Sequence, residues 1–270
     1  LKKNDYVVGT HRSHGHYLAK GGNLKKMLAE IYGKTNGCSK GYGGSMHLID
    51  LNVNFMGSSA IVGNSLPIGA GLALTISIEN SKKVSCIFFG EGCVEEGIFH
   101  ETVNFCALNK LPVLFVCENN LYSVYSSLSV RQPKNRSIAK MVNAMGIKSF
   151  CINGNDVCKV YEITSRELSK IRSGLGPRFI EFNTYRWREH CGPNFDNHIG
   201  YRAEKEFYEW KKKDPIKQYE NKLLKNKEIT KKEIKKIDDN LLKEINLAYN
   251  YAEKSPFPKP SEAFKNVYAK

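Results

Sequence analysis

The feature of this sequence that most restricts its fold is a pair of short apolar runs separated by one amphipathic segment. The runs are Val84–Phe89 and Val113–Cys117, and the helical pattern between them covers Glu95–Asn109. A short run that is apolar at every position is typical of a strand buried on both faces. Strand–helix–strand order makes the two strands parallel, with a right-handed crossover. We therefore expect an open α/β sheet.

The same alternation continues on both sides of this unit. Further strands are expected at Phe150–Ile152 and Phe179–Tyr185, with a helix over Val157–Arg172 between them. Helical spacing is also found in Asn23–Tyr32 and Leu66–Ile78. We predict an open, mostly parallel sheet with helices on both faces in a domain spanning residues 1–204, followed by a helical C-terminal extension over residues 205–270.

Composition excludes several classes of protein. The 270 residues are 41% hydrophobic and 25% charged, as in an ordinary globular protein. No apolar run approaches the roughly 20 residues that span a bilayer, so no membrane-spanning segment is expected. The eight cysteines form no CxxC pair and fall mostly in apolar runs, which predicts reduced thiols and a cytoplasmic protein. The chain begins at Leu1, and we expect its true start to lie upstream.

A formal net charge of +14 raises the alternative of nucleic-acid binding. Twelve lysines and six acidic residues lie between Lys211 and Lys243, and this segment contains no arginine. Its lysines alternate with acidic and apolar residues, which indicates amphipathic helices with solvated faces. Arginine is the residue that bidentate phosphate and base contacts favour. We therefore expect no nucleic-acid partner, although a basic binding protein stays open as an alternative.

Polar clusters follow the two strands of the central unit. Gly90-Glu91-Gly92 comes after the first strand and Glu118-Asn119-Asn120 after the second. Ligands of open parallel sheets bind beyond the carboxyl ends of the strands. Glycine lets the backbone approach a phosphate at a helix N-terminus, and carboxylate and amide oxygens are suitable ligands for Mg²⁺ or Ca²⁺. The pairing predicts a metal-bridged diphosphate.

This pairing resembles the thiamine diphosphate motif, in which an acidic residue between two glycines is followed by two asparagines. The wider chain, over about residues 4–215, is similar to the alpha subunit of the decarboxylating component of 2-oxo-acid dehydrogenase complexes, of the pyruvate, branched-chain or acetoin type. The segments that carry the resemblance are GTHRSHGHYLAKG, GCSKGYGGSMH, IVGNSLPIGAG, LNKLPVLFVCENNLYSV and GPRFIEFNTYRW. The resemblance implies the thiamine diphosphate-binding fold.

The resemblance also implies roles for individual residues. Glu91, the side chain of Asn120 and the main-chain carbonyl of Tyr122 match the ligands of Mg²⁺. The positions that match contacts to thiamine diphosphate are His11, Arg12, Ala60, Val62, Gly90, Gly92, Cys93 and Asn120. His47 and His190 match positions lining the active-site channel and are the candidates for steering substrate and transferring protons.

Alternatives stay open for the histidines. His11, His14 and His16 have a spacing that a zinc site could use, but no nearby cysteine or carboxylate completes a tetrahedral set. A histidine in a glycine-rich loop, such as His47, is by default a solvated or hydrogen-bonded residue.

The chain departs from the family pattern in two ways. Glu91 stands where the family has aspartate, which puts the fit to Mg²⁺ in doubt because Mg²⁺ demands near-octahedral geometry. The family's N-terminal helices, with a further active-site histidine, precede the region present here. These departures leave open a non-catalytic subunit.

The activity implied is oxidative decarboxylation of a small 2-oxo acid, with pyruvate the first choice, and acyl transfer to lipoyl on an acyltransferase core. The family places an essential carboxylate on a beta subunit. We therefore expect an alpha2beta2 heterotetramer that is inactive without its beta chains. The alternative within enzymes is acetoin dehydrogenase or another thiamine-dependent carbon–carbon lyase or ligase.

Overall fold

The computed structural model of the chain describes residues 1–265 and divides into two compact units. Unit 1 contains residues 1–8 and 62–230, and unit 2 contains residues 9–61 together with the segment from Lys231 onward. Residues 1–265 contain no helix with the length and hydrophobicity of a membrane-spanning segment.

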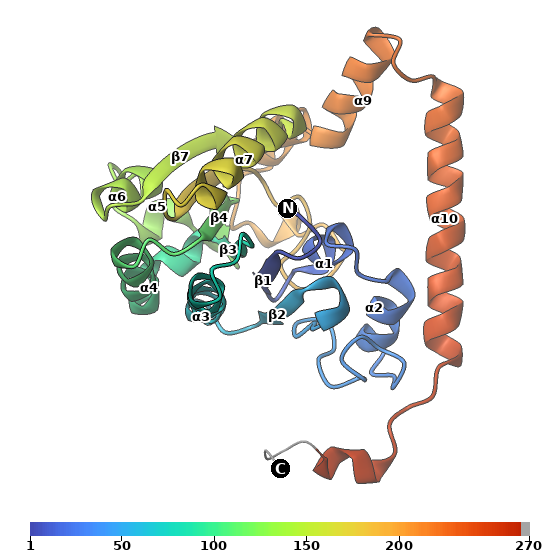
Figure 1. Cartoon of the computed structure of the whole chain (residues 1–270). Helices are drawn as coiled ribbons and strands as arrows, with labels where there is room; N and C mark the ends of the chain where they lie inside the picture. The colour runs from blue at the N-terminus through green and yellow to red at the C-terminus, as the bar shows by residue number, and fades with distance from the viewer. Residues whose placement is uncertain (266–270) are drawn as a thin grey trace. The chain divides into compact units, whose positions relative to one another are not determined.

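Unit 1 is built on a parallel sheet with the strand order β1-β3-β4-β8-β7 (Figure 1). The strands are β1 (Tyr6–Thr10), β3 (Ser85–Gly90), β4 (Val113–Asn119), β7 (Lys148–Asn153) and β8 (Arg178–Asn183). The expected open parallel α/β sheet is confirmed. The central strand β4 is buried almost throughout because strands pair with both of its edges and helices cover its two faces.

The helices of unit 1 connect these strands. They are α3 (Ser65–Ile78), the 3₁₀ helix η2 (Glu91–Glu95), α4 (Gly97–Leu108), α5 (Leu128–Arg131), α6 (Ile138–Ala144), α7 (Val157–Arg172), η3 (Asn197–Ile199), α8 (Glu204–Lys211) and α9 (Pro215–Lys225). The crossover from β3 to β4 and that from β7 to β8 run in opposite directions along the sheet. With right-handed crossovers, α4 and α7 therefore cover opposite faces.

The strand and helix predictions hold with shifts of a few residues, and one long prediction divides. The helical extension expected over residues 205–270 contains, in the part described up to residue 265, the separate helices α8, α9 and α10 (Lys231–Lys254). Asp214 accepts the backbone N–H groups of Ile216 and Lys217, and Pro215 occupies the first turn of α9. Lys227, at a φ of +58°, follows the end of α9. The domain boundary after residue 204 stays a prediction; α8 and α9 belong to unit 1 and α10 to unit 2.

Unit 2 pairs a short N-terminal helix with a long C-terminal one. Its elements are α1 (His14–Ala19), α2 (Leu24–Ile31), η1 (Leu51–Val53), β2 (Phe55–Ser59), α10 (Lys231–Lys254) and η4 (Pro260–Phe264). Helices α2 and α10 lie side by side in Figure 1. Leu28 and Ala29 of α2 form a buried cluster with Ala248 and Ala252 of α10. The small alanines allow the two helices to approach closely, which anchors the glycine-rich loop that follows α2.

Candidate functional site

The carboxyl ends of β3 and β4 lie side by side because Gly90 and Glu118 are register partners in the parallel ladder. Helix η2 begins directly after β3, at Glu91. Asn119 ends β4, and the hairpin strand β5 (Tyr122–Ser123) follows, paired with β6 (Ser126–Ser127). One edge of the sheet in unit 1 therefore carries these sequence-predicted residues: Gly90, Glu91, Gly92, Cys93, Asn120 and Tyr122.

The Glu91 carboxylate is buried at this edge, with 1% of its side chain exposed. Arg131 donates a hydrogen bond from Nη2 to Glu91 Oε1 at 2.5 Å. The backbone N–H groups of Glu91 and Asn120 also act on the carboxylate. Burial raises the pKa of Glu91, and the charge of Arg131 is the largest of the opposing influences. Glu91 and the Asn120 main chain thus meet at one point.

Arg131 was not foreseen from the sequence, and it bridges two carboxylates of the same 3₁₀ turn. Its Nη1 donates to Glu95 Oε1 at 2.5 Å, and its Nε donates to the Ser126 carbonyl at 3.2 Å. Gln132 adds a bond from Nε2 to Glu95 Oε1 at 3.0 Å. Residues forty positions apart in the chain meet here, and no local pattern announces the contact.

The two asparagines after β4 have different surroundings. Asn119 donates from Nδ2 to Glu181 Oε1 at 2.8 Å, a buried bond, and accepts the Leu121 N–H at 3.1 Å. Asn120 accepts the Tyr122 N–H on Oδ1 at 3.2 Å. Leu121 lies in the left-handed region at a φ of +72°, which turns the chain directly after Asn120. Asn119 is thereby tied to β8, whereas Asn120 shapes the turn beside Glu91.

The donor set at this edge fits a hard divalent cation in its chemistry. A carboxylate, an amide oxygen and a main-chain carbonyl are ligands that Mg²⁺ accepts. The structure already seats a positive group, the Arg131 guanidinium, on the Glu91 carboxylate. A cation is therefore accommodated there. Within residues 1–265, no three His, Cys, Asp or Glu side chains gather in a metal-binding arrangement, so the zinc alternative for His11, His14 and His16 gains no support.

The turn after β3 is closely packed. A Cβ on Gly92 would lie 2.9 Å from Ser123 Oγ and 3.5 Å from Arg131 Nη1. Burial raises the pKa of Cys93 to about 12, while a bond involving the Gly63 main chain opposes the shift. That bond brings the segment of Val62 to Cys93 within unit 1. A thiol with this pKa is not a nucleophile near neutral pH, which agrees with a packing or backbone-contact role.

Unit 2 contains a second buried carboxylate that sequence reasoning missed. Glu30, on α2, is completely buried. Its Oε2 accepts the N–H groups of Ser39 and Gly41 at 2.8 and 2.9 Å, and its Oε1 accepts those of Gly43 and Gly44 at 2.7 and 3.2 Å. Backbone amides that converge in this way form an anion-binding concavity, here filled by a side chain of the same unit.

The glycines of the loop follow from this arrangement. A Cβ on Gly37 would overlap the Glu30 carboxylate and lie 2.6 Å from the Glu30 Cα. Gly41 and Gly44 have φ values of +84° and +57°, which suit residues without a Cβ. Glycine-rich sequence is typical of a tight loop, and a signal for its cause was present: the lone acidic residue Glu30 at the end of the preceding helix.

The remaining predicted residues of unit 2 lie around this loop or before α1. His47 is exposed at the end of the loop, where its backbone N–H donates to the Gly43 carbonyl at 3.2 Å. The side chain of Ser45 contacts the His14 ring, and Ser45 Oγ lies 2.9 Å from His14 Nε2. Burial, together with the positive charge of Arg12, lowers the pKa of His11. Ala60 follows β2 and is half-buried.

His190 lies in unit 1, in the loop after β8, and is half-buried. The loop is tied down by its arginines. Arg186 donates from Nη2 to the Val124 carbonyl at 2.7 Å, which joins the loop to the β5–β6 turn. Arg202 and Asp196 form an almost fully buried ion pair at 2.6 Å. His190 is therefore presented by an anchored loop.

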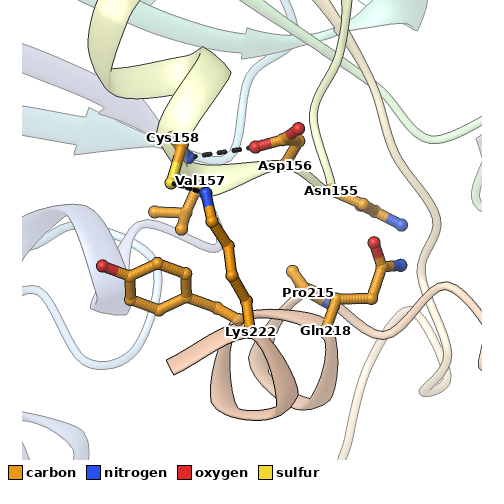
Figure 2. Close-up of a pocket in the computed structure, with 8 residues that line it drawn as sticks. Asn155, Asp156, Val157, Cys158, Pro215, Gln218 and Lys222 are labelled. Carbon is orange, nitrogen blue, oxygen red and sulfur yellow. Dashed lines mark hydrogen bonds between the residues drawn. The ribbon is translucent and has the colours of Figure 1, made fainter. Parts of the chain in front are cut away.

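A separate cleft in unit 1 lies between the N-terminal ends of α7 and α9 (Figure 2). Asp156 caps α7 by accepting the Cys158 N–H at 3.1 Å, and Lys222 Nζ lies 3.5 Å from Cys158 Sγ. Pro215 and Gln218 line the other side. This cleft includes none of the sequence-predicted site residues, so the candidate site is the edge at Glu91.

Comparison with known proteins identifies a shared family. The model of the "Dehydrogenase E1 component" family matches residues 1–261. The alpha subunit of acetoin:2,6-dichlorophenolindophenol oxidoreductase from Bacillus subtilis is 37% identical over 269 residues, which cover 99% of this chain and 79% of that protein. The pyruvate dehydrogenase E1 component subunit alpha of Rickettsia bellii is 34% identical over 267 residues, covering 99% and 81%. A chloroplastic pyruvate dehydrogenase E1 component subunit alpha-3 of Arabidopsis thaliana is 34% identical over 275 residues, covering 100% and 63%.

Proposed function

This chain belongs to the dehydrogenase E1 component family, and from that premise we propose that it is the alpha subunit of an enzyme that uses thiamine diphosphate and Mg²⁺ to decarboxylate a 2-oxo acid. Pyruvate is the proposed substrate, and lipoyl on an acyltransferase core is the proposed acyl acceptor. The observation that carries the proposal is the meeting of buried Glu91 with Asn120 at the adjoining ends of β3 and β4.

In this proposal Glu91, the Asn120 amide oxygen and the Tyr122 carbonyl hold the metal ion. The main chain at Gly90, Gly92 and Cys93 contacts the diphosphate. Glycine at position 92 supports this role because a Cβ there would already crowd Ser123. When bound, thiamine diphosphate supplies the nucleophilic carbon and the electron sink of decarboxylation.

The family resemblance suggests roles for the remaining predicted residues. His11 and Arg12 are proposed to bind the diphosphate, and the main chain at Ala60 and Val62 to contact the aminopyrimidine. A lowered pKa keeps His11 neutral near physiological pH, where it can donate one hydrogen bond without adding charge. His47 and His190 are proposed to orient the substrate and move protons at its carbonyl oxygen.

A beta subunit is proposed as partner, in an alpha2beta2 assembly. Helix α3 supports a covered surface, because Ile68, Leu74 and Ile78 are exposed on it although they are apolar. Exposed apolar surfaces of this kind often mark protein contacts. The eight cysteines are free, which agrees with the proposed cytoplasmic location.

Calorimetric titration of the assembled alpha and beta chains with thiamine diphosphate and Mg²⁺ tests the proposal. We expect metal-dependent binding in the parent protein, no such binding in Glu91→Ala, and unchanged binding in Glu101→Ala. Glu101 is an exposed acidic residue of α4, so it matches the change in charge without touching the site. Metal-dependent binding that survives in Glu91→Ala would remove Glu91 from the ligand set.

Acetoin oxidation is a second candidate, favoured by the Bacillus subtilis relative. Reduction of 2,6-dichlorophenolindophenol by the assembled enzyme, measured with pyruvate and with acetoin in parallel, separates the two. A higher kcat/KM for acetoin would replace pyruvate as the substrate without changing the proposed cofactor. Turnover of neither substrate by an assembly that binds thiamine diphosphate would favour a non-catalytic subunit.

A further inference from the structure

The guanidinium of Arg131 is held on three sides by acceptors of unit 1. Glu91 Oε1 and Glu95 Oε1 each lie 2.5 Å from one of its terminal nitrogens, and the Ser126 carbonyl accepts from Nε. Arg131 is 12% exposed, whereas Glu91 is 1% exposed and Glu95 26% exposed. The arginine therefore spans from a buried carboxylate to one that reaches solvent.

We propose that Arg131 is a built-in counter-cation that competes with the divalent metal ion for the carboxylate of Glu91. The inference rests on the proposed function, since it takes Glu91 as a metal ligand. It adds a residue whose effect on metal binding is opposite to that of a ligand: removing Arg131 strengthens binding.

The charges at the site make the competition necessary. A buried carboxylate needs a compensating charge, and Arg131 provides it when no metal ion is bound. A divalent ion on the same carboxylate would stand within a few ångströms of the guanidinium, and two cations so close repel each other strongly in a poorly solvated site. Glu91 can therefore satisfy one of them fully, but not both.

Arg131 has a second carboxylate partner that it can keep when it leaves Glu91. Glu95 lies nearer to solvent and is already bonded to Nη1. The guanidinium can thus give up Glu91 and keep its ion pair with Glu95. Its displacement by a metal ion would therefore leave neither Arg131 nor Glu91 without a partner of opposite charge.

Arg131 and the proposed carbonyl ligand lie on one short strap, which runs from Tyr122 through β5, β6 and α5 to Arg131. The Leu128 N–H donates to the Leu121 carbonyl at 2.8 Å and closes the strap at its base. If a metal ion were held by the Tyr122 carbonyl and Glu91, the first residue of this strap would bind it and Arg131, the last, would have to give up Glu91. The affinity for metal is then reduced by the fraction of molecules in which Arg131 holds Glu91.

The test is Mn²⁺ binding to the assembled enzyme in the presence of thiamine diphosphate, followed by the electron paramagnetic resonance signal of free Mn²⁺. We expect Arg131→Gln to lower the Kd for Mn²⁺ about tenfold, because the competing state is lost. Arg131→Lys keeps the charge but loses the fork that reaches both carboxylates, so its Kd is expected to fall as well, by about threefold.

The matched control is Arg136→Gln. Arg136 is exposed and lies shortly after Arg131, so this variant makes the same change in net charge away from Glu91. We expect its Kd to equal that of the parent protein. Equal Kd values in the parent, Arg131→Gln and Arg131→Lys would overturn the inference while leaving the proposed metal site intact.

Two other results are also decisive. A lower Kd in Arg131→Gln with an unchanged Kd in Arg131→Lys would overturn the inference, since the general field of the charge would then account for the effect. Absence of Mn²⁺ binding in the parent and in every variant, each shown to be folded by circular dichroism, would instead remove the metal site of the proposed function.

Discussion

The negative charge of a buried carboxylate is compensated in different ways at two glutamates of this chain. Glu30 in unit 2 is held by four backbone N–H groups of the loop that follows its helix. Glu91 in unit 1 is held by the side chain of Arg131, with two backbone groups beside it. The partners of Glu30 cannot leave unless the loop unfolds, whereas the partner of Glu91 can swing away. The first carboxylate is suited to holding a loop in place, and the second to exchanging one cation for another.

Removing the Glu30 carboxylate should have the largest effect on the free energy of unfolding. Glu30→Ala leaves four partly buried amides without their acceptor, and we expect a loss of about 4 kcal/mol in the free energy of unfolding. Denaturant titration measures it, with Glu244→Ala, an exposed residue of α10, as the control in the same unit. A loss below about 1 kcal/mol would show that water replaces the carboxylate and that the loop does not depend on it.

Adding a methyl group to the glycine-rich loop after α2 should have the next largest effect on stability. Gly37→Ala forces a Cβ against the Cα and carboxylate of Glu30, and we expect a loss of about 3 kcal/mol, measured by denaturant titration, because the backbone has to move. Gly92→Ala should cost about 1 kcal/mol, since the atom it meets belongs to the Ser123 side chain, which can rotate. Gly71→Ala on α3 meets nothing within 4 Å and is the control. Equal losses at positions 37 and 92 would erase the contrast between the two regions.

The ion pair should show a smaller effect with a distinct pattern. Glu91→Gln and Arg131→Gln are each expected to lower the free energy of unfolding by about 2 kcal/mol, because each leaves a poorly solvated charge with fewer partners. The double variant should lose less than the sum, with a coupling of about 1 to 2 kcal/mol in a double-mutant cycle measured by denaturant titration. Additive losses would mean that the pair contributes nothing as a pair.

The smallest effect is expected on the alkylation rates of two cysteines, Cys38 in unit 2 and Cys93 in unit 1. Burial raises the pKa of Cys38, and the charge of Glu30 is the next largest cause. Glu30→Gln removes a negative charge that disfavours the thiolate, so the pKa of Cys38 should fall and its alkylation at mildly alkaline pH should become faster. Cys93, whose pKa is raised to about 12 by burial, should stay equally slow in Glu91→Gln. Mass spectrometry after iodoacetamide treatment measures both rates.

A faster reaction of Cys38 could also come from a loosened loop. The exposed Cys191 provides the reference rate within the same sample. If the alkylation of Cys38 in Glu30→Gln keeps the same pH midpoint as in the parent and changes only in its plateau, loosening accounts for it and the electrostatic explanation is wrong.

Local patterns were sufficient for much of the fold. Helix α7 begins and ends where periodicity placed it, because Asp156 caps it and its apolar face is regular. The central strands were found because their apolar runs are continuous. The short strands β5 and β6 and the short helices α1 and α6 were not predicted, since a turn or two of chain contains too few residues to establish a period.

For the candidate site, the residues that follow the two strands were accessible to sequence reasoning, because parallel pairing forces neighbouring strand ends together. Arg131 was not accessible. It lies forty residues from Glu91, in a segment without regular periodicity, and its position depends on how the β5–β6 hairpin folds back over η2.

By itself, the sequence determined the strand–helix alternation and the placement of an acidic residue and an amide at adjacent strand ends, since these depend on local periodicity and on parallel pairing. It also determined family membership, through motifs spread along the chain. Tertiary structure alone decided which partner neutralises each buried carboxylate. Charge compensation depends on distance in space, and folding brought backbone amides to Glu30 and a guanidinium to Glu91.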